Sequence, residues 1–135
     1  MWYAIGDVLT GLQLTGQLFD AIPCALTAVF SAAQTYPACE ASACYVISYV
    51  TRATCLCGDA IALVCQMAGI VGRAGGGTQI VAASLKTPAE VMEAILNEAH
   101  HVIIPLQLIE EMAEHKLSAL TIEEFAPAAA SETRA

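Results

Sequence analysis

The first half of the chain consists of long apolar runs that few polar residues interrupt. Residues 41–72 contain no proline and only two charged side chains, Arg52 and Asp59. An apolar run of this length predicts a helix that is buried on most of its faces. A second uncharged run covers residues 21–39, and Pro37 predicts a turn between the two runs because the residue before a proline disfavours helix.

Small residues recur along the predicted 41–72 helix at alternating spacings of three and four. We call this row the small-residue seam: Cys44, Ser48, Thr51, Cys55, Gly58, Ala62, Cys65, Gly69 and Gly72. Such spacing places the residues on one helix face, and small side chains let two membrane helices approach closely. Together with the 21–39 run, the seam predicts a transmembrane helical hairpin over residues 21–73.

Polar residues form a second row beside the seam. This polar column, Arg52, Asp59 and Gln66, repeats every seven residues. Polar groups that lie beside the packing face, with apolar residues on the outer faces, are typical of a helix in a bilayer. The helix between Arg52 and Arg73 would be about 30 Å long, which matches the hydrocarbon core of a membrane. Asp59 would then form an interhelical ion pair or hydrogen bond, or serve a proton pathway.

The second half of the chain has the pattern of a water-facing helix. Thr87, Pro88 and Glu90 combine an N-cap, a proline in the first turn and a capping-box glutamate. An apolar stripe continues from this start, so we expect one amphipathic helix over residues 87–118, kinked at Pro105. The expected segments are an N-terminal helical segment (1–20), the transmembrane hairpin (21–73), a Gly-rich linker (74–86), the amphipathic helix (87–118) and a capped turn with a tail (119–135).

The charge distribution separates the two halves and excludes one class of partner. Twelve of the eighteen charged residues lie in residues 86–135, and the net charge is −8. With only five basic residues the chain offers no patch that could neutralise nucleic-acid phosphates. The charge distribution therefore predicts that the first half of the chain lies in lipid or in a protein interior, and that the second half faces water.

The cysteines lack the spacing of a metal or redox site. Cys55 and Cys57 would lie about 200° apart on a helix, too far round to share a metal or a disulfide. No CxxC pair occurs, so a zinc or iron–sulfur site is not predicted. A bridge from Cys24 to Cys39 or to Cys44, near the expected turn, stays open.

Other candidate chemistry is sparse. His100, His101 and His115 are weak candidate ligands for chlorophyll or haem, and the favoured interpretation places them on a water-facing or interfacial stripe. Glu98 and His101 form one Glu-x-x-His pair, whereas a di-iron helical bundle needs two. No phosphate-binding loop or nucleophile elbow occurs. We therefore expect no metal site and no enzymatic activity.

Together these patterns predict an all-α protein with a transmembrane hairpin and a C-terminal amphipathic helix. Its expected function is that of a non-catalytic accessory subunit, acting in assembly or stabilisation of a large energy-transducing membrane complex, respiratory or photosynthetic. Its partners would be other membrane subunits and lipid, in the mitochondrial inner membrane or the thylakoid. No cofactor is predicted, and contact with chlorophyll, carotenoid or lipid stays open.

Three alternatives remain. The first is a small membrane channel or proton-carrying homo-oligomer that uses Asp59. The second is a soluble helical interaction protein with residues 41–72 as its core. The third is an enzyme that uses Glu98 and the histidines.

Overall fold

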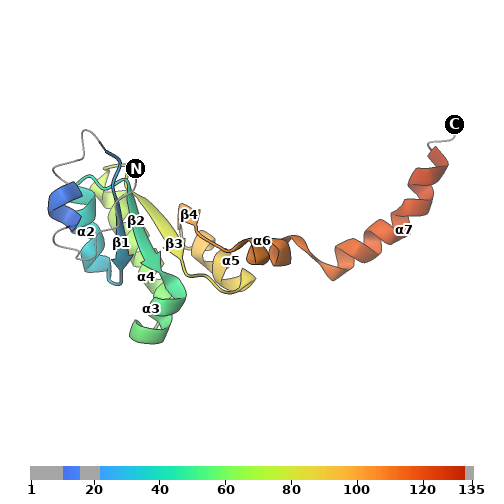
Figure 1. The fold of residues 1–135 in the computed structure, drawn as a ribbon, viewed down its shortest axis with the longest axis horizontal. Coiled ribbons are helices and arrows are strands. Elements are labelled where there is room, and N and C mark those ends of the chain that lie inside the picture. The colour runs from blue at the N-terminus through green and yellow to red at the C-terminus, as the bar shows by residue number, and fades with distance from the viewer. Residues whose placement is uncertain (1–10, 16–21, 133–135) are drawn as a thin grey trace. The chain divides into compact units, whose positions relative to one another are not determined.

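The computed structural model describes residues 11–15 and 22–132, and the chain divides into two compact units after Ile104. The first unit contains a four-stranded sheet in the order β1-β2-β3-β4, and every neighbouring pair of strands is parallel (Figure 1). Its strands are β1 (Ala25–Val29), β2 (Tyr45–Tyr49), β3 (Gln79–Ala83) and β4 (His101–Val102). Its helices are α2 (Ala32–Glu40), α3 (Val50–Cys57), α4 (Ala60–Ala74) and α5 (Pro88–Leu96), and residues 11–15 are also helical.

The strand order is sequential, with at least one helix between each strand and the next. Crossovers between parallel strands are almost always right-handed, so a sheet that grows in one direction places its helices on one face. Here α2 packs against α4, and α4 packs against β3. Sequential order without a reversal is the pattern of a wall of a β/α barrel, whereas doubly wound sheets reverse their order at a switch point.

The two faces of the sheet differ in burial. Val46 and Ser48 of β2 are fully buried, and their register partners Ile80 and Ala82 of β3 are fully buried as well. The alternate residues of β2 are only half-buried: Tyr45, Ile47 and Tyr49. Because side chains alternate along a strand, one face carries the core beneath the helices, and the other face is more open along β2 but is buried along β3 at Val81 and Ala83.

The predicted single helix over residues 41–72 is wrong. Residues 45–49 form β2, and their sequence YVISY is rich in the β-branched and aromatic residues that strands favour. A short apolar run in a parallel sheet has no polar alternation, so periodicity alone does not separate it from a buried helix. Gly58, at φ +99°, ends α3, and the Asp59 carboxylate then caps α4 by accepting the amide N–H groups of Ile61 and Ala62, both at 3.0 Å.

The all-α fold and its transmembrane hairpin are therefore wrong as well. In the part of the chain that the structure describes, no helix has both the length and the apolar character needed to cross a bilayer. The turn predicted at Pro37 is also absent, because α2 continues through Pro37 to Glu40.

The start of the predicted amphipathic helix is confirmed, but its extent is wrong. Thr87 caps α5, accepting the amide of Glu90 at 3.2 Å, and Glu90 completes the capping box. The helix ends at Leu96, since Glu98 adopts a left-handed backbone (φ +70°) and residues 101–102 pair with β3.

The second unit contains α6 (Leu106–Ala113) and α7 (Lys116–Glu132). Pro105 caps α6 instead of kinking a longer helix. Thr121 lies inside α7 and donates its hydroxyl to the Leu117 carbonyl at 2.8 Å, so it does not cap a turn. Of the N-terminal helical segment expected over residues 1–20, residues 11–15 are helical and the others lie outside the described residues.

Candidate functional site

Two hydroxyl groups meet near the carboxyl end of β2. Thr27 lies in β1 and Tyr49 is the last residue of β2, and the Thr27 Oγ1 to Tyr49 Oη distance is 3.0 Å. The ring of Phe30 contacts Tyr49 edge-on, with 6.2 Å between ring centroids. In sheets of parallel strands with connecting helices, ligands bind at the carboxyl ends of the strands. This hydroxyl pair is therefore the centre of the candidate site.

An irregularity in β1 sets the position of Thr27. The register with β2 shifts between Leu26 and Val29, and Ala28 between them has φ +59°. A bulge of this kind redirects neighbouring side chains, and such bulges are frequent beside active sites. Left-handed backbone costs a non-glycine residue about 1–2 kcal/mol. Ser84, directly after β3, has φ +62°, so the same edge of the sheet carries a second such residue.

A carboxylate ties together the connections that follow β2 and β3. Glu90 accepts the hydroxyl of Thr51 at 3.2 Å and the backbone amides of Lys86 and Thr87 at 2.6 and 3.3 Å. Thr51 lies in the first turn of α3, directly after β2. The segments that flank the candidate site are thus held by one side chain.

Positive charge also gathers at this edge. Arg52 follows Tyr49 in the first turn of α3, Lys86 follows β3, and both side chains are exposed. Among the described residues, the Arg52 guanidinium has no carboxylate within ion-pair distance. A cation that no carboxylate neutralises, at the carboxyl ends of strands and in a chain of net charge −8, suits an anionic ligand.

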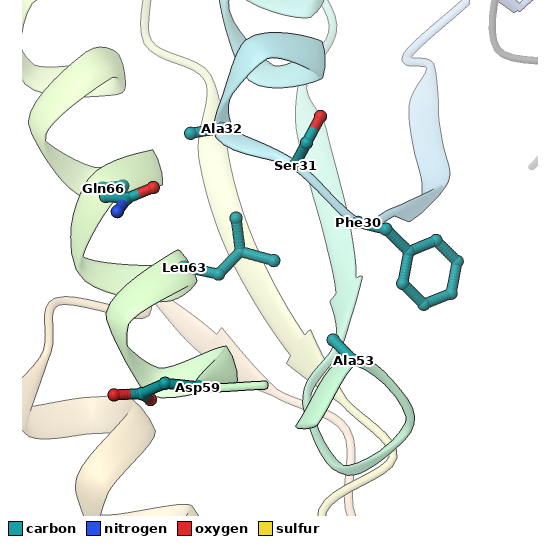
Figure 2. A pocket seen from close by; sticks show the side chains of 7 residues that line it. All are labelled: Phe30, Ser31, Ala32, Ala53, Asp59, Leu63 and Gln66. Atoms are coloured by element: carbon teal, nitrogen blue, oxygen red, sulfur yellow. The ribbon is translucent and has the colours of Figure 1, made fainter. Parts of the chain in front are cut away.

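A pocket of about 230 Å³ lies beside this edge, between the β1–α2 connection, α3 and α4. Figure 2 shows the Phe30 ring and the Asp59 carboxylate pointing away from each other, with Leu63 between them. Sites for small molecules usually measure about 300–1,000 Å³ and have several polar groups that point inward. This pocket is smaller, and one of its polar groups, the Asp59 carboxylate, is occupied in capping α4. We therefore place the candidate site at the hydroxyl pair.

The structure separates the small-residue seam into several elements. Cys44 precedes β2, Ser48 lies in β2, Thr51 and Cys55 lie in α3, Gly58 ends α3, and Ala62, Cys65, Gly69 and Gly72 lie in α4. The four residues in α4 do share a face. That face is largely exposed, so in this unit it does not pack against a second helix.

The polar column is also divided. Arg52 lies in α3, Asp59 caps α4 and Gln66 lies in α4, and all three are exposed. Asp59 and Gln66 both line the pocket described above (Figure 2), whereas Arg52 does not. Arg52 is the one member that belongs to the candidate site.

The three histidines do not converge. His100 Nδ1 accepts the Ile80 amide at 3.2 Å, and His101 Nε2 lies 2.9 Å from Gln79 Oε1 and contacts the Tyr45 ring. These two histidines lie over the first residues of β2 and β3, whereas His115 belongs to the second unit. Within the described residues no three histidine, cysteine or acidic side chains gather as metal ligands do.

Sequence reasoning missed the central residues of the site. Thr27 and Tyr49 were not singled out because each is an ordinary polar residue within or at the end of an apolar run. The available signal was positional. Each of the runs 25–29, 45–49 and 79–83 is short, apolar and followed by a helix start, and in a parallel sheet the residues at that junction are exposed to ligands.

Comparison with known proteins identifies the relationship. Residues 10–135 match the family described as transaldolase/fructose-6-phosphate aldolase. This chain belongs to that family. Three curated relatives are each named probable transaldolase, and all are similar over about three quarters of this chain. Identity is 34% over 100 residues for Oceanobacillus iheyensis (74% of this chain, 47% of the relative), 37% over 100 residues for Halalkalibacterium halodurans (74% and 47%), and 35% over 104 residues for Symbiobacterium thermophilum (77% and 48%).

The chain spans about half the length of these relatives. A solved structure of a tyrosine-to-phenylalanine mutant of mandelate oxidase with (S)-mandelic acid resembles it with a TM-score of 0.52. That likeness covers 69% of this chain and 28% of the oxidase at 14% identity, so it concerns the fold alone.

Family membership corrects the predicted function. The chain belongs to a family of enzymes, so the prediction of a non-catalytic accessory subunit of a respiratory or photosynthetic complex is wrong. The predicted partners, membrane subunits and lipid, and the predicted location in the mitochondrial inner membrane or thylakoid are wrong for the same reason. The two alternative functions, a channel that uses Asp59 and a helical interaction protein, are wrong as well. The absence of a cofactor, and contact with chlorophyll or carotenoid, stay untested predictions.

Proposed function

We propose that this chain contributes to an active site that breaks and forms a carbon–carbon bond of a sugar phosphate by aldol chemistry. In this proposal the hydroxyl of Tyr49 moves protons and Arg52 binds the phosphate. The observation that carries the proposal is the 3.0 Å contact between the hydroxyl of Thr27, in β1, and the hydroxyl of Tyr49, at the carboxyl end of the parallel strand β2.

Aldol cleavage requires two proton movements. A base removes the proton of the hydroxyl beside the breaking bond, and an acid returns a proton to the carbon that carries the new negative charge. A positioned side chain performs such a transfer directly or through one water molecule. The Thr27 hydroxyl supports this role in Tyr49, because it holds the phenol oxygen in place and either atom of the pair can donate.

The phosphate requires a separate contact. Guanidinium groups bind phosphate oxygens with two parallel hydrogen bonds, which fixes orientation as well as affinity. Arg52 is three residues beyond Tyr49 and exposed. A substrate whose phosphate lies on Arg52 would therefore have its reacting carbons near the hydroxyl pair.

The proposal assigns no covalent nucleophile to this chain. A lysine that attacks a carbonyl needs desolvation or a neighbouring cation to lose its proton at neutral pH. Lys86 and Lys116, the lysines of this chain, are both exposed. The curated relatives are about twice as long as this chain. The aldol reaction is therefore proposed here together with the roles of Tyr49 and Arg52.

Calorimetric titration of the chain with fructose 6-phosphate tests binding, and a coupled assay for glyceraldehyde 3-phosphate tests cleavage. We expect saturable binding that Arg52→Ala weakens about tenfold or more, in line with the loss of a charge-assisted hydrogen bond. Arg73→Ala is the matched control, because Arg73 donates to the Gly69 carbonyl at 2.8 Å in the last turn of α4. Equal losses in the two variants, or no binding at all, would contradict the proposed phosphate contact.

A further inference from the structure

Three thiols gather at the edge of the sheet opposite the candidate site. Cys24 directly precedes β1, Cys44 directly precedes β2, and Cys39 lies in the last turn of α2. All three are free thiols. The aldol chemistry proposed above does not involve these thiols.

The backbone sets Cys24 and Cys44 opposite each other. The register pairs Ala25 with Tyr45 and Leu26 with Val46, and one step back along both strands leads to the two cysteines. The Cys44 amide donates to the Cys24 carbonyl at 2.9 Å, which fixes the two residues side by side. Neighbouring strands lie about 4.8 Å apart, within the Cα separation of about 4.4–6.8 Å that a disulfide bridges.

The side chains can also meet. Residues that face each other in a parallel pair project to the same face of the sheet, here the face on which Leu26 and Val46 are buried. Cys24 Sγ now donates to the Ile22 carbonyl at 3.3 Å, a weak hydrogen bond that a rotation of the side chain would release. Both cysteines are half-buried, so a small oxidant reaches them, whereas Cys39 is buried.

We propose that Cys24 and Cys44 form a dithiol modification site that a hydroperoxide converts into an intramolecular disulfide. One thiolate attacks the peroxide oxygen, which gives a sulfenic acid and releases an alcohol, or water when the oxidant is hydrogen peroxide. The second thiol attacks the sulfenic sulfur and expels water, so two thiols are oxidised by two electrons and one peroxide is reduced. The bridge joins the beginnings of the two strands that carry Thr27 and Tyr49.

The experiment exposes the reduced chain to about one equivalent of hydrogen peroxide and maps disulfides by mass spectrometry of non-reduced peptides. A background of Cys55→Ser and Cys65→Ser removes two exposed thiols that would otherwise link separate molecules. We expect a peptide pair joined through Cys24 and Cys44, with a mass loss of about two hydrogens. A link from Cys24 to Cys39 would overturn the proposal, and so would sulfinic acid at Cys24 and Cys44 without a link.

A second measurement tests the bridge through its effect on stability. Oxidation should raise the unfolding temperature of the chain, because the bridge closes the loop that contains α2 and restricts the unfolded state. The same treatment of Cys24→Ser should leave the unfolding temperature unchanged. An oxidised chain that unfolds at the same or a lower temperature than the reduced chain would contradict the fit of the bridge to this backbone.

Discussion

The hydroxyl oxygens of Thr27 and Tyr49 lie 3.0 Å apart, although the residues are separated by 22 positions in the chain. The contact depends on the parallel pairing of β1 and β2 and on the bulge at Ala28 that alters the register near the end of β1. Two hydroxyls this close form a pair in which one donates and the other retains a free proton or lone pair for a ligand.

Replacement of Tyr49 by phenylalanine removes the hydroxyl and keeps the ring that contacts Phe30. If the Tyr49 hydroxyl moves a proton in the reaction, kcat should fall by about 10²–10⁴-fold, which is the usual contribution of a positioned acid or base. Steady-state kinetics on fructose 6-phosphate measure the change. KM should change little, because the phosphate contact at Arg52 remains.

Two further variants separate the role of the hydroxyl from that of the fold. Thr27→Val should lower kcat less than Tyr49→Phe, since it leaves the phenol present but unsupported. Tyr36→Phe is the control, because Tyr36 is an exposed residue of α2 away from the pair. A Tyr49→Phe protein that retains full kcat would remove Tyr49 from the mechanism.

The position of Glu90 predicts a stability effect at the edge of the site. Its carboxylate accepts hydrogen bonds from Thr51, Lys86 and Thr87, so Glu90→Ala breaks the cap of α5 and the tie to α3 together. Loss of a cap costs about 1 kcal/mol, and the tie to Thr51 should raise the total to about 2 kcal/mol. Urea unfolding measures the change in the free energy of unfolding.

The control for Glu90 is Glu93→Ala, an exposed glutamate one turn later in α5. Thr87→Ala should cost about 1 kcal/mol alone. The double variant should be less destabilised than the sum of its parts, since both residues belong to one capping box. Strict additivity would show that the two side chains act separately.

The cap at Thr87 is the clearest case of a feature that the sequence predicts, because capping chemistry depends on residues within four positions of one another. The strands were misjudged for a physical reason. A strand buried in a parallel sheet has no polar alternation, and YVISY lies within an apolar run that also satisfies helical spacing. Gly58 and Asp59 separate α3 from α4. From the sequence alone, the same two residues also fit a continuous helix, with Gly58 in the small-residue seam and Asp59 in the polar column.

The candidate site was hidden for a related reason. Thr27 and Tyr49 meet only through strand pairing and a bulge, neither of which has a local sequence signature. Arg52 was singled out as a member of a polar column in a membrane helix. In the structure it is exposed in the first turn of α3, beside the candidate site. Chemistry that is assembled from the ends of different strands becomes visible only when the strand order is known.

Ser48 in the core predicts a substitution that increases stability. Its side chain is fully buried and its hydroxyl has no hydrogen-bond partner among the described residues. An unpaired buried hydroxyl costs about 1–3 kcal/mol, so Ser48→Ala should raise the free energy of unfolding by about 1 kcal/mol. Thr78 is the contrasting case, because its buried hydroxyl donates to the Ala43 carbonyl at 2.8 Å. Thr78→Val should therefore destabilise the fold, and the same sign for both variants would contradict this reasoning.

Cys39 predicts how stability changes with pH. Burial, assisted by the nearby charge of Glu40, raises the pKa of the Cys39 thiol above its ordinary value. The unfolded chain then loses this proton near pH 8.5 while the folded chain keeps it, so the unfolded state binds fewer protons and stability falls as the pH rises. The stabilising contribution is complete below about pH 8 and declines above it, by up to about 1.4 kcal/mol per pH unit until the folded thiol also ionises.

The measurement is urea unfolding with a reducing agent, at several values between about pH 7.5 and pH 9.5, for the wild-type chain and for Cys39→Ala. Cys39→Ala should be less stable at neutral pH, because it removes buried volume, and its stability should decline less steeply with pH. Cys65→Ala, which changes an exposed thiol of α4, should follow the wild-type slope. Parallel pH profiles for wild type and Cys39→Ala would show that the Cys39 thiol ionises equally in the folded and unfolded chain, and the burial argument would fail.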